Sequence, residues 1–254
     1  MDIACAAGYF RSDLEKAAYM DLDRITHPLI LAKGSHRPGS SNGCAMNAIS
    51  YISGEAQITD FPLTSARALA ACVQLCNDLL AGPDRYLSPE NSILALDLAW
   101  QTVGTADVAD SVIHAWVAEL LANPNWGVVR YTENASVAAI FGVAGLHRRL
   151  ASGDMSPIAA WDSADRAARA ISATLAGAGL YAVRAAYQAA ALVNTEHCAT
   201  LDAVVGNALC AHTLATEGTG AARMVDVTRH AIRSWRHLAQ LDDLDRIDPS
   251  KATT

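Results

Sequence analysis

Residues 157–191 read PIAAWDSADRAARAISATLAGAGLYAVRAAYQAAA, an alanine-rich stretch interrupted by one pair of glycines. Alanine has the highest intrinsic helix propensity, and its small side chain allows helix axes to approach closely. Two i,i+4 ion pairs, Asp162 with Arg166 and Asp165 with Arg169, lie on the face opposite the apolar residues. The stretch therefore predicts two closely packed helices joined by a short connection.

Helical periods continue from this stretch in both directions, separated by Gly, Pro and Asn, with no sustained alternation of β-branched residues. Ser88, Pro89 and Glu90 combine an N-cap, a first-turn proline and a first-turn acid, and Thr105 is expected to cap the next helix. Helices are expected at about 12–25, 44–52, 64–81, 88–104, 105–122, 133–151, 157–176, 179–193, 198–216 and 221–241. Short connections imply antiparallel neighbours, so the predicted fold class is all-α, an antiparallel helical bundle or short α-solenoid of about nine or ten helices.

The sequence predicts a boundary between two parts of the chain at Gly153 and Asp154, which are followed by Ser156 and Pro157. It separates an N-terminal helical part, residues 1–152, from an alanine-rich C-terminal helical part, residues 153–254. The sequence leaves open whether these parts are two domains or one continuous domain.

Composition excludes several classes of protein. The 254 residues are 52% hydrophobic and carry a net charge of −7, which disfavours binding to nucleic acid by charge alone. No run of about 18 apolar residues is present to span a membrane, and the N-terminus lacks the pattern of a signal peptide. We expect a cytoplasmic protein.

The six cysteines are too dispersed for a small disulfide framework, so reduced thiols are expected. Cys72 and Cys76 stand at i and i+4, a spacing that metal ligands sometimes use, but no second pair has a zinc-finger spacing. Two packed core thiols are the preferred interpretation, and neither a metal nor a cofactor is expected.

Cys44 is the candidate catalytic residue. The loop HRPGSSNG at residues 36–43 places it where a helix should start, and there the helix dipole stabilises a thiolate while loop amides can bind an oxyanion. The alternative is a structural cysteine at the start of a buried helix. Nothing in the sequence selects a histidine as its base.

The segment NGCAMNAISYISG resembles the catalytic-cysteine helix of papain-like peptidases, a resemblance that implies a nucleophilic Cys44. The β-rich half that supplies the histidine in those peptidases has no counterpart in this sequence. The longer segment 43–78, GCAMNAISYISGEAQITDFPLTSARALAACVQLCND, resembles uncharacterised alanine-rich helical proteins of actinobacteria and their phages. That resemblance implies a helical architecture and brings no activity.

The last predicted helix concentrates positive charge on an otherwise acidic chain. A site for an anion or an acidic partner would consist of Arg229, His230, Arg233, Arg236 and His237. A charged stripe is usually solvated, and acidic residues follow this one, so a solvated surface is the preferred interpretation.

Two functions follow from these patterns. The preferred one is a helical protein-interaction module that self-associates or binds another protein, because no paired carboxylates, phosphate loop or metal signature appears. The alternative is a thiol-dependent hydrolase or acyl transferase with Cys44 as its nucleophile.

Overall fold

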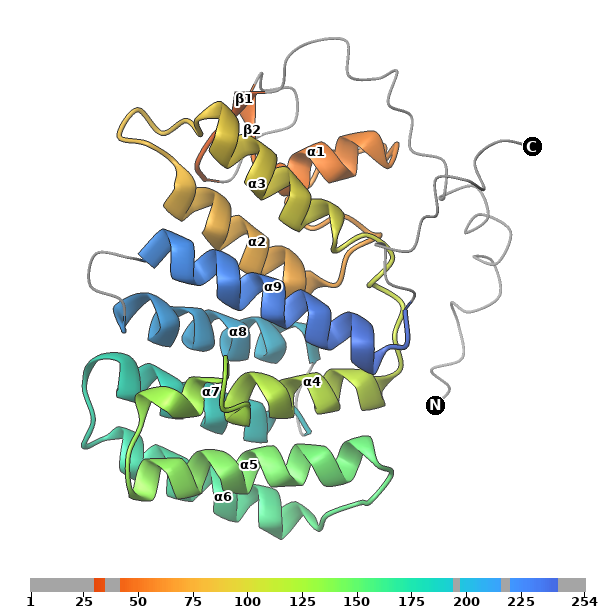
Figure 1. Ribbon diagram of the computed structural model, residues 1–254. Coiled ribbons are helices and arrows are strands. Elements are labelled where there is room, and N and C mark those ends of the chain that lie inside the picture. Colours follow the sequence, from red (N-terminus) through yellow and green to blue (C-terminus); the bar gives the residue numbers. More distant parts are fainter. Residues whose placement is uncertain (1–29, 35–41, 194–196, 216–219, 242–254) are drawn as a thin grey trace.

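The computed structural model describes residues 30–34, 42–193, 197–215 and 220–241, and in these ranges the fold is all-α (Figure 1). Nine α-helices lie there: α1 (Ala45–Ile52), α2 (Arg67–Leu80), α3 (Pro89–Trp100), α4 (Asp110–Ala122), α5 (Ala135–Ala151), α6 (Ile158–Ser172), α7 (Gly177–Ala191), α8 (His197–Leu214) and α9 (Gly220–Leu238). A short 3-10 helix, η2 (Val128–Tyr131), follows α4. Strands β1 (Ile30–Leu31) and β2 (Asn42–Gly43) pair in parallel over two residues each.

The predicted all-α class is confirmed. Each helix expected from residue 44 onward has a counterpart whose limits differ by at most five residues at either end. The start of α3 follows the predicted capping chemistry, because the backbone N–H of Asn91 donates to Ser88 Oγ at 3.2 Å and Pro89 occupies the first turn. The helix expected over residues 12–25 lies outside the described residues.

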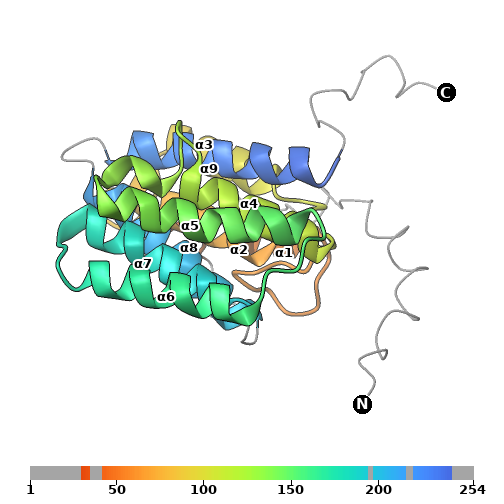
Figure 2. The ribbon, with the colours of Figure 1, turned by 90° about the horizontal axis from the view of Figure 1, so that it is seen from below.

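The helices form two layers, which Figure 2 shows with the stack viewed along its length. One layer contains α3, α9, α4 and α5, and the other contains α1, α2, α8, α7 and α6. Within the second layer, α2, α8, α7 and α6 each pack against the next helix. Between the layers, α9 packs on α2 and α8, and α5 packs on α6 and α7.

Chain order differs from order within the layers. Helices α4 and α5 extend one layer, α6 to α8 return along the other, and α9 then packs between α2 and α4 (Figure 1). A solenoid in which each repeat contacts only its neighbours has no such closure, so the described helices form a closed bundle. The turn at Gly153 connects α5 to α6, and helices on both sides of it contribute to one apolar core. The division into two parts at this turn stays a prediction.

Alanine permits the closest contacts of the bundle. Helix α7 lies in the second layer between α8 and α6 and also packs on α5. Its buried face consists of Val183 and five alanines, Ala182, Ala185, Ala186, Ala189 and Ala190. Side chains this small let three neighbours reach one helix, as the alanine-rich sequence predicts.

Two tryptophans join α9 to the rest of the bundle. The rings of Trp116 in α4 and Trp235 in α9 are buried and meet edge to face, with centroids 5.2 Å apart. The indole N–H of Trp116 donates to the carbonyl oxygen of Ala231 at 2.9 Å, and that of Trp235 donates to the carbonyl oxygen of Thr105 at 3.1 Å. Each large apolar side chain is therefore buried with its polar atom satisfied.

Thr105 does not cap α4, and the expected helix start at this residue is wrong. The helix begins at Asp110, and Thr105 is fully buried in the connection that precedes it. Its Oγ1 accepts the backbone N–H of Ala66 at 2.9 Å and donates to the carbonyl oxygen of Thr102 at 2.5 Å. Tertiary hydrogen bonds to the connection before α2 thus replace the local cap.

Thr105→Val tests this junction, because valine keeps the shape of threonine but leaves the N–H of Ala66 and the carbonyl of Thr102 without this partner. We expect the free energy of unfolding, measured by urea denaturation, to fall by about 1–3 kcal/mol. The control Thr174→Val removes an exposed hydroxyl that donates to the carbonyl of Ile171, and it should change stability by less than about 0.5 kcal/mol. Equal losses in the two variants would show that Thr105 has no special role.

Candidate functional site

The predicted nucleophile, Cys44, lies at the start of α1 and is only 2% exposed. Its Sγ is 3.6 Å from Oδ1 of Asp60, and the thiol donates toward that carboxylate. Asn47 connects the two residues, since its Nδ2 donates to the same oxygen of Asp60 at 2.8 Å and its Oδ1 accepts the N–H of Cys44 at 2.9 Å. The partner of the thiol is therefore a carboxylate, whereas an activated cysteine needs a base such as histidine.

A second asparagine side chain forms a hydrogen bond with the backbone N–H of the residue that follows Cys44. Asn77, from the last turn of α2, accepts the backbone N–H of Ala45 with its Oδ1 at 3.2 Å. Its Nδ2 donates to the carbonyl oxygen of Ala32 at 2.9 Å, which joins α2 to the segment after β1. Two of the amides that an oxyanion site would use are thus bonded to asparagine side chains.

Burial raises the pKa of the Cys44 thiol to about 12, and the negative charge of Asp60 contributes to this increase. The thiol is therefore protonated at neutral pH. Together with the occupied amides, this favours the structural cysteine over the catalytic one.

Cys72 and Cys76 are buried core thiols, as preferred from the sequence. Cys76 also forms a hydrogen bond with Thr228 Oγ1 at 3.1 Å, across the contact between α2 and α9. Within the described ranges, no group of three or more His, Cys, Asp or Glu side chains is placed to hold a metal ion.

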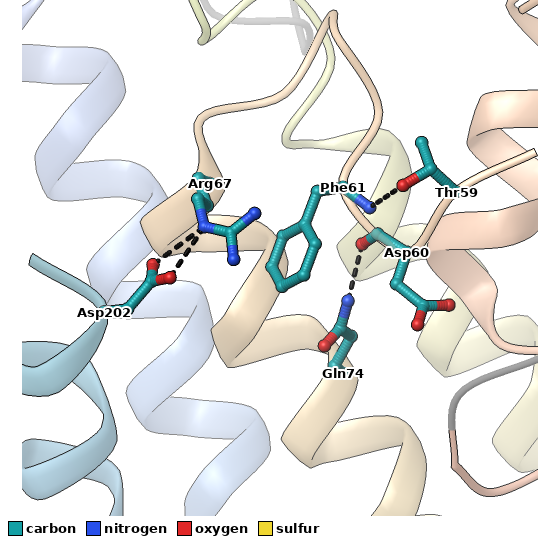
Figure 3. Close-up of polar contacts among 6 residues, drawn as sticks. All are labelled: Thr59, Asp60, Phe61, Arg67, Gln74 and Asp202. Carbon is teal, nitrogen blue, oxygen red and sulfur yellow. Dashed lines mark hydrogen bonds and ion pairs between the residues drawn. The ribbon is translucent and has the colours of Figure 1, made fainter. Parts of the chain in front are cut away.

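The loop between α1 and α2 is fixed to α2, and α2 is joined there to α8 (Figure 3). The carbonyl oxygen of Asp60 accepts a hydrogen bond from Gln74 Nε2 in α2. Next to it, the guanidinium of Arg67 lies 3.7 Å from the ring centroid of Phe61, while Arg67 Nε donates to Asp202 of α8 at 2.7 Å. Together with the hydrogen bond from Asn47 to the Asp60 carboxylate, these contacts hold the loop between α1 and α2 in place.

The predicted basic face of α9 is partly used by the fold. Arg236 donates to the carbonyl oxygens of Gln101 and Val103, at the C-terminal end of α3, where positive charge is favourable. Arg229 lies 3.9 Å from Asp226 on its own helix. The other three predicted residues, His230, Arg233 and His237, are exposed. The arrangement favours a solvated surface over an anion site.

Two buried histidines, which the sequence did not single out, join three helices. The Nδ1 atoms of His114 in α4 and His147 in α5 are 3.0 Å apart. His147 Nε2 donates to the carbonyl oxygen of Ala189 in α7 at 3.1 Å, so its Nδ1 carries a lone pair and accepts the Nδ1–H of His114. Burial lowers the pKa of His147 to about 3, and the nearby His114 contributes to the decrease. His147 is thus neutral at neutral pH and links α5 to α4 and α7.

The solvent side of α5 is the other feature that sequence analysis missed. We call it the outer face of α5, and it consists of Ala135, Ala138, Phe141, Gly142, Gly145, Arg148 and Arg149. Phe141 is 46% exposed, Met155 in the turn after α5 is 81% exposed, and Ile158 at the start of α6 is 63% exposed. Helices α5 and α6, which contain or border these residues, lie at one end of the stack (Figure 1).

The fold does not require glycine at either of the two glycine positions of this face. A Cβ added to Gly142 or Gly145 would meet nothing within 4 Å, and neither residue has a positive φ. Glycine in a helix interior is less stable than alanine by roughly 0.5–1 kcal/mol. The segment AIFGVAG, with two glycines inside a helical period, is the sequence signal that identifies this face.

Comparison of the chain with protein-family models, with curated proteins and with solved structures gave no match. Among the described helices, none is long and apolar enough to cross a membrane.

The first prediction for this region concerns thiol reactivity. Iodoacetamide at pH 7.5 should modify the exposed Cys210 and leave Cys44 unmodified until the protein is unfolded, because burial keeps Cys44 protonated. Peptide mass spectrometry reads out each site separately. Modification of native Cys44 ahead of Cys210 would instead identify an activated nucleophile.

The second prediction concerns pH. Burial lowers the pKa of His147 to about 3 and that of His212 to about 4, from 6.5 in the unfolded chain. The unfolded state therefore binds more protons below pH 6.5, and the free energy of unfolding should fall by roughly 1 kcal/mol per pH unit for each histidine as the pH drops toward 5.

Urea denaturation between pH 7 and 5 measures this slope. His147→Leu should be less stable at pH 7 but should show a smaller slope, whereas His230→Leu, at an exposed position, should keep the full slope. A wild-type stability that does not change over this range is incompatible with neutral buried histidines.

Proposed function

We propose that the protein is a helical protein-interaction module that self-associates through the outer face of α5. The observation that carries the proposal is the exposed ring of Phe141 beside two glycines that the fold does not require. A glycine surface lets another helix approach closely, and an aromatic side chain beside it supplies apolar area to bury. Met155 and Ile158, at the connection from α5 to α6, add further exposed apolar area.

Charge complementarity supports a second copy of the chain as the partner. In an antiparallel pair of α5 helices related by a two-fold axis near Phe141, the start of one helix lies at the level of the last turn of the other. Glu133 lies just before the start of α5, and Arg149 lies in its last turn. Within the described residues Arg149 has only the neutral partner Ser156, at 3.0 Å, and Glu133 has no ion pair. Each end of the pair thus combines an acidic and a basic residue at the rim of an apolar centre.

The cytoplasm is the proposed compartment. All four cysteines in the described residues are unbridged, and Cys210 among them is exposed, which suits a reducing environment.

Sedimentation equilibrium tests the proposal. We expect the wild-type protein to form dimers in a concentration-dependent way and Phe141→Glu to be monomeric, because two buried carboxylates would meet near the axis. Ile93→Glu is the matched control, since Ile93 is 70% exposed on α3, at the other end of the stack, and this change should leave the dimer intact. A wild-type monomer at about 100 μM, a concentration at which weak specific pairs associate, would refute the proposal.

Gly145→Ala separates association from folding. In the monomer, alanine should raise the free energy of unfolding by roughly 0.5–1 kcal/mol, because it is the better helix former and its Cβ enters open space. In the dimer the same methyl group should hold the helices apart and weaken association. Opposite signs for the two effects support the interface, and unchanged association argues against it.

A further inference from the structure

Helix α3 has a partly apolar surface at the end of the stack opposite to α5 and α6 (Figure 1). One side of α3 packs on α1 and α2. Ile93 and Trp100, at i and i+7, lie on the other side, where they are 70% and 39% exposed. We call this side the outer face of α3, and it consists of Glu90, Ile93, Leu96, Asp97 and Trp100. Exposed apolar side chains that line up on one side of a helix mark a surface of interaction.

The N-terminal part of the chain joins the bundle beside this helix. Ala32 pairs with Tyr86 in an antiparallel bridge, and the backbone N–H of Leu87 donates to the carbonyl oxygen of Leu31 at 3.0 Å. Helix α3 starts two residues after Leu87, so β1 lies beside the start of α3 (Figure 1). Residues 1–29 are therefore attached to the bundle next to the outer face of α3.

The helix that the sequence predicts over residues 12–25 has one apolar side. That side consists of Leu14, Ala18, Leu22 and Ile25, at i, i+4, i+8 and i+11. A helix of this length is only marginally stable in water by itself, so it needs a surface to pack on. It would be about 21 Å long and α3, with 12 residues, is about 18 Å long, so the two match in length.

The connection to β1 lets the predicted helix reach α3. The five residues from position 25 to Ile30 span at most about 17 Å, which is longer than the distance of 8–10 Å between the axes of packed helices. The end of the predicted helix thus lies close to the start of α3, which makes the two helices antiparallel. Its last turn contains Arg24 and the first turn of α3 contains Glu90, so opposite charges lie at this end of the contact.

We propose that residues 12–25 form a helix that packs antiparallel on the outer face of α3 of the same chain. The apolar side of this helix covers Ile93 and Trp100. The chain's own segment is favoured over a second copy, because a short connection holds it at a millimolar effective concentration. The contact is separate from the outer face of α5, which lies at the other end of the stack (Figure 1).

Acrylamide quenching of tryptophan fluorescence tests the contact in the full chain. Trp100 reports on this face, because each of the other four tryptophans is at most 4% exposed: Trp116, Trp126, Trp161 and Trp235. We expect little quenching in the wild type. Leu22→Glu places a carboxylate on the apolar side of the predicted helix and should make roughly one fifth of the emission accessible, the share of one tryptophan in five.

Met20→Glu is the matched control, because it introduces the same charge on the opposite side of the predicted helix and should leave quenching as in the wild type. Trp100 that is as accessible in the wild type as in Leu22→Glu would overturn the proposal. Equal effects of Leu22→Glu and Met20→Glu would also overturn it.

Hydrogen exchange of residues 12–25 tests the contact from the side of α3. Ile93→Glu should speed this exchange about tenfold, because the helix loses its apolar surface. Leu214→Glu, at a 52% exposed position on α8, should leave the exchange unchanged. Equal exchange in the wild type and Ile93→Glu would contradict the contact. Protection that is lost on dilution would assign the covering helix to a second copy and overturn the assignment to the same chain.

Discussion

The packing of α9 between α2 and α4 is the constraint on which the bundle depends. Trp116 and Trp235 bury two large rings at this contact, and each indole N–H reaches a backbone carbonyl of another element, so neither ring is buried at the expense of an unsatisfied donor. Because α9 is the last described helix and α2 is one of the first, this contact closes the chain on itself. Thr105, in the connection before α4, is then held by two elements. Its carbonyl oxygen accepts the indole N–H of Trp235, and its hydroxyl accepts the backbone N–H of Ala66.

The same closure decides which polar groups remain available for function. Around Cys44, the amides and the thiol are bonded to Asn47, Asn77 and Asp60, so the features that resemble a nucleophile site serve to attach α1 to its neighbours. At the end of the stack formed by α5 and α6, the fold leaves more side chains without a packing partner. There Phe141 is exposed on α5, and Met155 and Ile158 are exposed at the connection to α6. Groups that the fold leaves unused are the better guides to binding.

Local sequence patterns predicted the helices well and the tertiary roles poorly. Ser88 caps α3 as its pattern indicates, because Ser88, Pro89 and Asn91 are close in sequence and no tertiary contact competes. Thr105 is likewise a hydroxyl residue just before an expected helix. Its hydroxyl, however, accepts the backbone N–H of Ala66, a tertiary contact that no local pattern can reveal. The contact between His114 and His147 likewise depends on the packing of α4 against α5 and has no local signal. The glycines of α5 were visible in the sequence, but only the structure shows that no neighbour requires them.

Native-state hydrogen exchange of α9, compared with α2 and α4, tests the closure most directly. If α9 holds the two parts of the bundle together, its buried amides exchange only through global unfolding, with the same free energy and the same denaturant dependence as those of α2 and α4. Exchange of α9 through a separate opening of lower free energy, while α2 and α4 stay protected, would show that the bundle is stable without it and would contradict this account.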